Sequence, residues 1–472
     1  MRFVLRSHGL LRVVLVFVAL IVAALLPVVA SGYSDMARAE GARQNKDYVS
    51  AAQYYGSASL KLPWKPELLE DAAIAMSHVD ADAAIALFER VRSRGGLSAN
   101  GWDVYGATYW TTGRYEPALE VWQVGLQQYP SHHEFYWLLH LAHRQLGDFA
   151  AEQTWLEKWL ATSKGRAFDH YELGLLLMTS DPARARTEFA IATSMDSSFD
   201  SAIRTLEATL DAAAHETEDS RRLVILGRGI GLVNEWHLAQ SVFEQAKSAN
   251  KQNPEAWAWL GEAHQENGLD GKPELDEALM LDPNDTLVRA LRALYWKRQG
   301  QYEAEIAEYS KAAQIEPDNA EWQSGLGGAY SATGDLVSAL ASYQKATSLE
   351  GENATYWRLL AAFCADNAVH VADIGLPAAR RAAELAPKDP QVLDALGWSF
   401  AQAGLLYNAE QALVKATQIA PDLALAHLHL AETYLRKGDQ ASAVRELKLV
   451  RQLDADGPAG EFAQRLLDQY FP

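Results

Sequence analysis

Small and apolar residues recur along the chain with the spacing of helices. In the segment 101–122, Trp102, Tyr105, Gly106 and Tyr109 follow one another at i, i+3, i+4 and i+7, so they share one face of a helix. Gly113 is expected to end that helix, and a second amphipathic segment follows it. The pattern therefore predicts two helices joined by a tight turn.

The same arrangement returns every 34 residues. The position of Gly106 is repeated at this interval in four runs: Gly106, His140 and Gly174; Gly227 and Gly261; Ala293, Gly327 and Ala361; Gly397 and Ala431. Glycines at the turn recur with the same interval in the pairs Gly113 and Gly147, Gly300 and Gly334, and Gly404 and Gly438. Such internal repetition predicts an array of helical hairpins, each packed against its neighbours.

The clearest copies of the unit share one order of residue types, as in Trp257-Leu260-Gly261, Gly327-Tyr330-Ala339-Tyr343 and Leu393-Leu396-Gly397-Phe400-Ala409. This order resembles the tetratricopeptide repeat (TPR), whose pattern is W-x2-L-G-x2-Y…A-x3-F…P. The resemblance covers roughly residues 36–456. It implies an all-α fold, a right-handed α-superhelix (solenoid) of about twelve TPR-like helical hairpins.

The regular interval is lost between Gly174 and Gly227, which suggests a break in the array. We expect an N-terminal TPR array over 35–198, an extra helix or irregular connection over 199–218, and a C-terminal TPR array over 219–456. The segment 457–472 is amphipathic and is predicted to be a capping helix.

Residues 1–34 are predicted to be a signal-anchor or transmembrane segment. Arg2, Arg6 and Arg12 precede a stretch without charge from Val13 to Ser34. An uncleaved membrane helix is the favoured interpretation, with a cleaved signal peptide or a buried segment as alternatives. The positive-inside rule then places the repeats outside the cytoplasm, or in a secreted protein if the segment is cleaved. With this N-terminus the chain resembles a bacterial, membrane-anchored type of TPR protein.

Composition and charge exclude several classes of partner and site. The chain has 61 acidic and 42 basic residues and a formal charge of −19, so nucleic acid is not expected as a partner. Cys364 is the only cysteine, which excludes an internal disulfide and any multi-cysteine metal site. His140 and His143 are one turn apart, but both occupy packing positions, and packing is preferred to metal binding. No catalytic or cofactor motif is present, so neither an enzyme nor a cofactor is expected.

The resemblance implies a concave groove lined by first-helix residues that lie off the packing face. Eight residues are predicted to form this partner-binding groove: Trp110, Trp137, Arg144, Tyr171, Met178, Arg228, Arg358 and Trp398. The alternative is an inner wall that only contacts solvent. The predicted function is a non-catalytic scaffold of the cell envelope that binds a protein or peptide segment. The alternative function is an accessory module of surface polysaccharide or glycan assembly that supports a separate enzyme.

Overall fold

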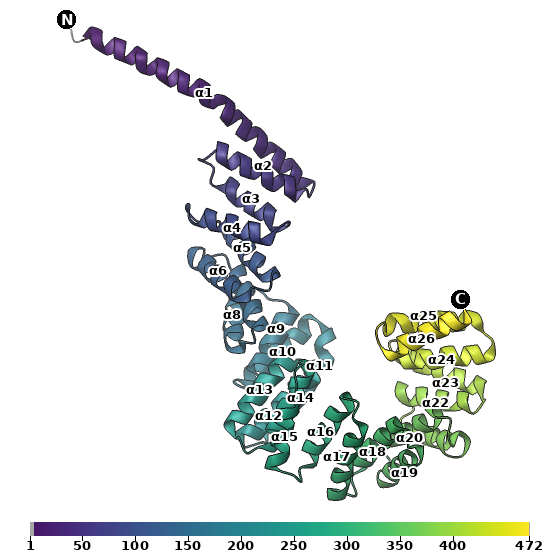
Figure 1. The fold of residues 1–472 in the computed structure, drawn as a ribbon. Helices are drawn as coiled ribbons and strands as arrows, with labels where there is room; N and C mark the ends of the chain where they lie inside the picture. The colour runs from purple at the N-terminus through teal and green to yellow at the C-terminus, as the bar shows by residue number, and fades with distance from the viewer. Residues whose placement is uncertain (1–3, 472) are drawn as a thin grey trace. The chain divides into compact units, whose positions relative to one another are not determined.

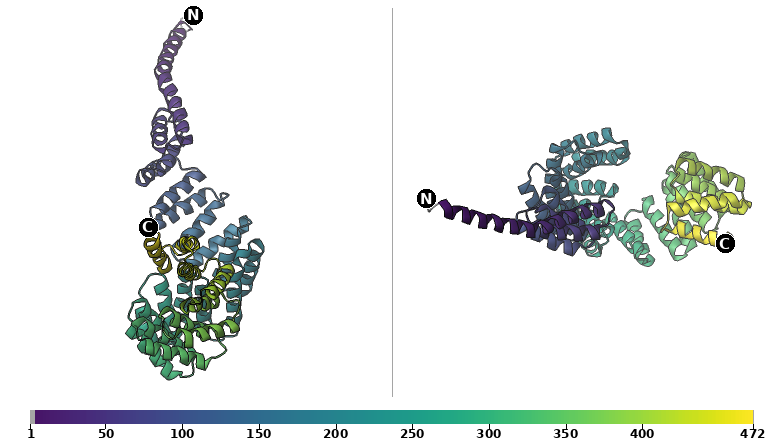
Figure 2. Two further views of the ribbon diagram at one scale, coloured as in Figure 1. Left: turned by 90° about the vertical axis from the view of Figure 1, so that its right-hand side faces the viewer. Right: turned by 90° about the horizontal axis from the view of Figure 1, so that it is seen from above.

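The structure, a computed structural model, describes residues 4–471, which form helices joined by turns and loops. It contains 26 α-helices, a short 3-10 helix (Ser197–Phe199) and a π-helical turn (Val371–Gly375). Helices that follow one another in the sequence alternate in direction (Figure 1), and two further views show the same order of helices (Figure 2). The predicted all-helical solenoid of hairpins is therefore confirmed.

Contacts divide the chain into two compact units, one of residues Met1–Ala212 and Leu232–Leu238, the other of residues Ala213–Gly231 and Ala239–Pro472. The helices up to the first boundary are α1 (Val4–Gln44), α2 (Tyr48–Lys61), α3 (Glu67–Ser77), α4 (Ala81–Arg92), α5 (Ala99–Thr111), α6 (Tyr115–Gln128), α7 (Glu134–Gln145), α8 (Phe149–Thr162), α9 (Ala167–Leu177), α10 (Pro182–Met195) and α11 (Asp200–Ala214).

The remaining helices belong wholly or mainly to the second unit. They are α12 (Asp219–Leu232), α13 (Trp236–Ala249), α14 (Pro254–Glu266), α15 (Lys272–Leu281), α16 (Thr286–Arg298), α17 (Tyr302–Ile315), α18 (Ala320–Thr333), α19 (Leu336–Leu349), α20 (Ala354–Asp366), α21 (Leu376–Leu385), α22 (Pro390–Gln402), α23 (Leu406–Ile419), α24 (Ala424–Lys437), α25 (Gln440–Leu453) and α26 (Pro458–Tyr470).

The repeated small residue holds the two helices of a hairpin together. In the hairpin α18–α19, a Cβ atom added to Gly327 would lie 2.9 Å from ring atoms of Tyr343. A Cβ atom on Gly174 would lie 2.4 Å from the ring of Phe189 in the hairpin α9–α10. Each large ring thus packs directly on glycine backbone, which explains why the first helix requires a small residue there.

The turn glycines end the first helices. Gly334, with φ 81°, is the C-cap of α18, and Gly438, with φ 79°, is the C-cap of α24. This left-handed conformation is most readily adopted by glycine and ends a helix. The next residue then starts the second helix, because the Asp335 and Asp439 side chains accept hydrogen bonds from the backbone N–H groups of Ser338 and Ser442.

The N-terminal helix α1 is 41 residues long and contains Pro27. Its C-terminal part packs on α2, where Ala39 shares a buried cluster with Ala51 and Tyr55. Within residues 4–471, no helix combines the length and the apolar content needed to cross a membrane. The membrane helix predicted over residues 1–34 is therefore not supported.

Candidate functional site

A pocket of about 190 Å³ lies on the first helices of three successive hairpins in the second unit. Helices α20, α22 and α24 and the turn before α24 line it with Arg358, Ala362, Asp366, Gln391, Asp394, Ala395, Trp398, Leu423, Leu425 and His429. Two of the predicted groove residues, Arg358 and Trp398, thus meet in one pocket.

The repeat explains why these helices form one surface. Arg358 and Asp394 each stand three residues before the small residue of their helix, and Ala362 and Trp398 each stand one residue after it. Equivalent positions of successive hairpins face the same side of the array, so their side chains adjoin. The pocket is therefore a product of the repeat and not of an insertion.

Trp398 forms a central wall of the pocket. It is 6% exposed, and its indole Nε1–H donates a 2.8 Å hydrogen bond to Oδ1 of Asp366. Its ring stacks on the imidazole of His429, and the Arg436 guanidinium lies 5.1 Å from the centre of the indole. Polar contacts and ring contacts together fix the orientation of the indole.

His429 and Asp394 form a buried pair beside Trp398. The Nδ1 atom of His429 lies 2.8 Å from Oδ1 of Asp394, and the two residues are 7% and 6% exposed. Burial alone would lower the pKa of His429. The Asp394 carboxylate, helped by Asp366 and Glu432, outweighs burial and raises that pKa above its ordinary value. The pocket therefore contains an imidazole that favours its charged form.

The pocket presents donors more readily than acceptors. Asp366 and Asp394 already accept hydrogen bonds from Trp398 and His429. Within residues 4–471, Arg358 forms no ion pair or hydrogen bond, and Nε2 of His429 has no hydrogen-bond partner. These free donors lie beside the apolar side chains of Leu423 and Leu425, so the pocket can bind a group that combines an acceptor with apolar surface.

Three predicted groove residues of the first unit, Trp110, Arg144 and Met178, stand four positions after the repeat position that Gly106, His140 and Gly174 occupy. Trp110 is half-buried, and its ring lies 4.8 Å from Tyr115 and 5.9 Å from Trp122. Met178 is completely buried. At about 100° per residue, four positions turn the helix to within about 40° of the packing face. Trp110 is therefore attached to the core, contrary to the expectation that it lies off the packing face.

The other predicted groove residues have varied surroundings. Tyr171 is only 5% exposed and packs with Phe189 and Phe199, so it offers little surface to a partner. Trp137 is half-buried, with the Arg166 guanidinium 5.7 Å from its ring centre. In the second unit, Arg228 is exposed and lies over Trp259 at 4.9 Å. Tyr171 and Met178, both predicted as groove residues, therefore expose too little surface to contact a partner.

Arg144 lies in a polar cluster inside the first unit. It contacts Glu172 and Glu235, at 3.2 Å for Glu235, and Nε2 of the fully buried His140 lies 3.5 Å from Oε2 of Glu172. Glu152, 2% exposed, lies 3.9 Å from Arg144. Burial lowers the pKa of His140 to about 4 and raises that of Glu152 to about 7. Arg144 is thus occupied by its own chain.

Neither cluster is arranged as a metal centre. Among residues 4–471, no group of three or more histidine, cysteine, aspartate or glutamate side chains is placed to hold a metal ion. Cys364 is buried, and burial raises the pKa of its thiol to about 11.

Sequence reasoning missed Asp366, Asp394 and His429. A signal was available, because His429 follows Asp394 by 35 residues, one repeat and one position, which places them on facing first helices. Pairing polar residues across successive repeats would have found this contact.

Comparisons with known proteins agree with the repeat. Residues 106–167 and 298–363 each match a family model described as tetratricopeptide repeat. Human protein O-mannosyl-transferase TMTC1 is 27% identical over 183 residues, which are 38% of this chain and 20% of that protein. The chain thus spans about a fifth of the length of this relative.

Two solved structures are similar over most of the chain at low identity. Yeast Tom70 is 16% identical with a TM-score of 0.42, covering 93% of this chain and 96% of that chain. The APC/C hetero-tetramer Cut9-Hcn1 is 13% identical with a TM-score of 0.46, covering 96% of this chain and 99% of that chain.

Proposed function

We propose that this tetratricopeptide repeat protein is a non-catalytic scaffold that binds a protein or peptide segment across the first helices α20, α22 and α24. The observation that carries the proposal is the pocket in which Arg358 and Trp398, from equivalent faces of neighbouring hairpins, meet the buried His429–Asp394 pair. Fold alone does not name a partner, whereas the pocket has a chemistry that restricts what can bind.

The chemistry of the pocket suits a polypeptide. Backbone carbonyl groups and carboxylate side chains supply acceptors for the free donors of Arg358 and His429, and an apolar side chain can contact Leu425, which is 47% exposed. Because the pocket is small, it would hold one side chain of a longer segment. Affinity would then depend on a few anchor side chains along the bound segment.

Photo-crosslinking in cells tests the proposal. A photoreactive amino acid at Ala362, which lines the pocket, should give a discrete polypeptide adduct that disappears when Arg358→Glu is added. The matched control is the same amino acid at Val337, which is 81% exposed outside the pocket. Equal adducts from both positions, or none from Ala362, would contradict the proposal, and a glycan adduct would favour the alternative role in polysaccharide assembly.

The extracytoplasmic location rests only on the charge pattern of the N-terminus, where Arg2, Arg6 and Arg12 precede an uncharged stretch. Protease digestion of intact cells, followed by detection of the repeats, tests it. If the repeats stay protected from protease until the cells are lysed, the repeats lie in the cytoplasm.

A further inference from the structure

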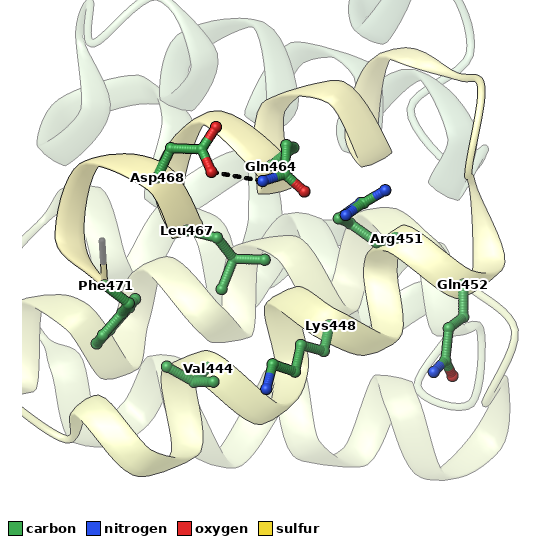
Figure 3. Close-up of a pocket in the computed structure, with 8 residues that line it drawn as sticks. All are labelled: Val444, Lys448, Arg451, Gln452, Gln464, Leu467, Asp468 and Phe471. Atoms are coloured by element: carbon green, nitrogen blue, oxygen red, sulfur yellow. Dashed lines mark hydrogen bonds between the residues drawn. The ribbon is translucent and has the colours of Figure 1, made fainter.

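A second groove lies away from the pocket, between α25 and α26 (Figure 3). It has a volume of about 540 Å³. Its lining comes from these two helices and the residue that follows them: Val444, Lys448, Arg451 and Gln452 from α25, and Gln464, Leu467, Asp468 and Phe471 from α26 and its end. Val444, Leu467 and Phe471 give the groove an apolar part, and the α25 side carries the two cations.

The two cations are unpaired. Within residues 4–471, neither Lys448 nor Arg451 forms an ion pair or a hydrogen bond, although they stand one turn apart on the same exposed side of α25. Lys437 at the end of α24, by contrast, pairs with Glu410. On a chain with a net charge of −19, two adjacent free cations are a local exception. Salt at physiological concentration limits the repulsion between an acidic ligand and the other acidic residues of the chain to about 8 Å. The charges of the residues at the groove therefore decide what binds.

Gln464 adds an unsatisfied acceptor. Its Nε2 donates a 2.5 Å hydrogen bond to Oδ1 of Asp468, drawn as the dashed line in Figure 3. Its Oε1 is buried and has no hydrogen-bond partner among residues 4–471. Exchanging the two amide atoms would turn an oxygen toward the Asp468 carboxylate, so the hydrogen bond fixes the orientation. A ligand that donates an N–H group would satisfy this oxygen.

The repeat shows which shape fits the groove. Helix α25 begins 104 residues after α19, so Lys448, Arg451 and Gln464 correspond to Gln344, Thr347 and Leu360. These three residues line a cavity of about 460 Å³ whose remaining wall includes Asp373, Pro377 and Ala378, from the π-helical turn and α21. Helix α21 therefore lies along the cavity between α19 and α20 and forms one of its walls. The groove between α25 and α26 is lined, in the part of the chain that the structure describes, by these two helices and the adjoining Phe471.

We propose that the groove between α25 and α26 is a docking site for an acidic amphipathic helix of a partner protein. The helix would take the place that α21 takes in the earlier repeat, with carboxylates beside Lys448 and Arg451 and apolar side chains on Leu467 and Phe471. Polar donors at its end would reach Oε1 of Gln464. This surface is separate from the pocket of α20, α22 and α24, and the proposal does not depend on a ligand there.

A helix of this chain supplies a probe. The segment 302–315, which forms α17, is the second helix of a hairpin and carries Glu303, Glu305 and Glu308 against Lys311. Aligned with α21 by their C-terminal ends, Glu303 and Glu308 take the places of Asp373 and Ala378, which line the earlier groove. The probe is a synthetic peptide of this sequence, held helical by a covalent link between the positions of Ser310 and Gln314, with a fluorophore for anisotropy.

The peptide should bind the full chain saturably. The double variant Lys448→Glu with Arg451→Glu should weaken binding about tenfold, since charge reversal replaces two attractions by repulsions. The control variant Lys388→Glu removes an exposed lysine elsewhere in the second unit and should leave affinity within about twofold. A peptide with Glu303→Gln and Glu308→Gln should also bind more weakly.

Three results would overturn the proposal. Absence of saturable binding would mean that α26 is only a solvated cap. Equal binding by the wild-type chain and the double variant would place the peptide elsewhere. Self-association of the full chain in sedimentation experiments, lost in the double variant, would make a second copy the occupant. Both substituted residues are exposed, and thermal unfolding of the double variant checks that it is folded.

Discussion

The indole of Trp398 lies flat on the imidazole of His429, with ring centroids 4.4 Å apart and ring planes 5° apart. The same imidazole binds Asp394 through its Nδ1 edge. Stacking on Trp398 restricts the rotation of the imidazole, and the Asp394 carboxylate places a negative charge beside it. The aromatic wall of the pocket and its titratable group are therefore one assembly.

Stability should depend on the protonation of His429. Its pKa in the folded chain is raised above the ordinary value of 6.5. The protonated form therefore contributes stability fully below pH 6.5, and this contribution is lost as pH rises through the folded pKa. Urea unfolding at several pH values between about 5.5 and 8.5 should show a declining free energy of unfolding. The decline should be smaller in His429→Gln, and parallel curves for the two proteins would refute the assignment.

Glu152 should destabilise the first unit when it ionises. Burial raises its pKa from 4.5 to about 7, so stability falls as pH rises from 4.5 toward 7 and stays low above it. Glu152→Gln should therefore raise the free energy of unfolding by about 3 kcal/mol at pH 8 and change it little at pH 4.5. The control is Glu116→Gln on the exposed start of α6, which removes a carboxylate that is not buried. A loss of stability in Glu152→Gln at pH 8 would show that the Arg144 interaction outweighs burial.

Adjacent glycines in α18 should respond in opposite directions to alanine. Gly327→Ala places a methyl group 2.9 Å from the Tyr343 ring and should cost about 1–3 kcal/mol. Gly328→Ala meets only the Tyr343 hydroxyl, at 3.6 Å, and should stabilise the helix by up to about 1 kcal/mol. Calorimetric melting of the two variants checks this, and similar shifts from both would contradict the close helix approach.

Trp110→Ala should destabilise the first unit. Its ring contacts Tyr115 and Trp122, and it is half-buried, so a loss of about 2 kcal/mol is expected rather than no change. Trp64 is 57% exposed and provides the comparison, because Trp64→Ala should stay within about 0.5 kcal/mol of the wild type. If Trp110→Ala melts like the wild type, the indole is free for a partner, as the sequence had suggested.

The hairpins could be predicted because each depends on a short-range rule. Tyr343 packs on Gly327, 16 residues before it, and Gly334 adopts a left-handed turn that glycine adopts most readily. Both features lie within one repeat. The periodicity of the sequence therefore sufficed for the helices and their pairing.

The surface chemistry was harder to predict because it combines residues from different repeats. Arg144 pairs with Glu235, 91 residues later, and no local pattern indicates that contact. Trp110 and Met178 were misplaced because their position differs from the packing face by only about 40°. Arg358 and Trp398 were predicted as groove residues, but the acidic and imidazole groups that define their pocket were not. Helical spacing predicts a face, and only the packed array shows which neighbours meet on it.

The pairing of Gly327 with Tyr343 has a consequence for synthesis. Such contacts close as soon as one hairpin has left the ribosome, since the two residues lie 16 positions apart. Chains with mainly local contacts fold fast, and units at the N-terminus fold first during translation. We therefore expect each hairpin to pack on a preceding hairpin that is already folded. The nascent chain would then expose one unfolded hairpin at a time.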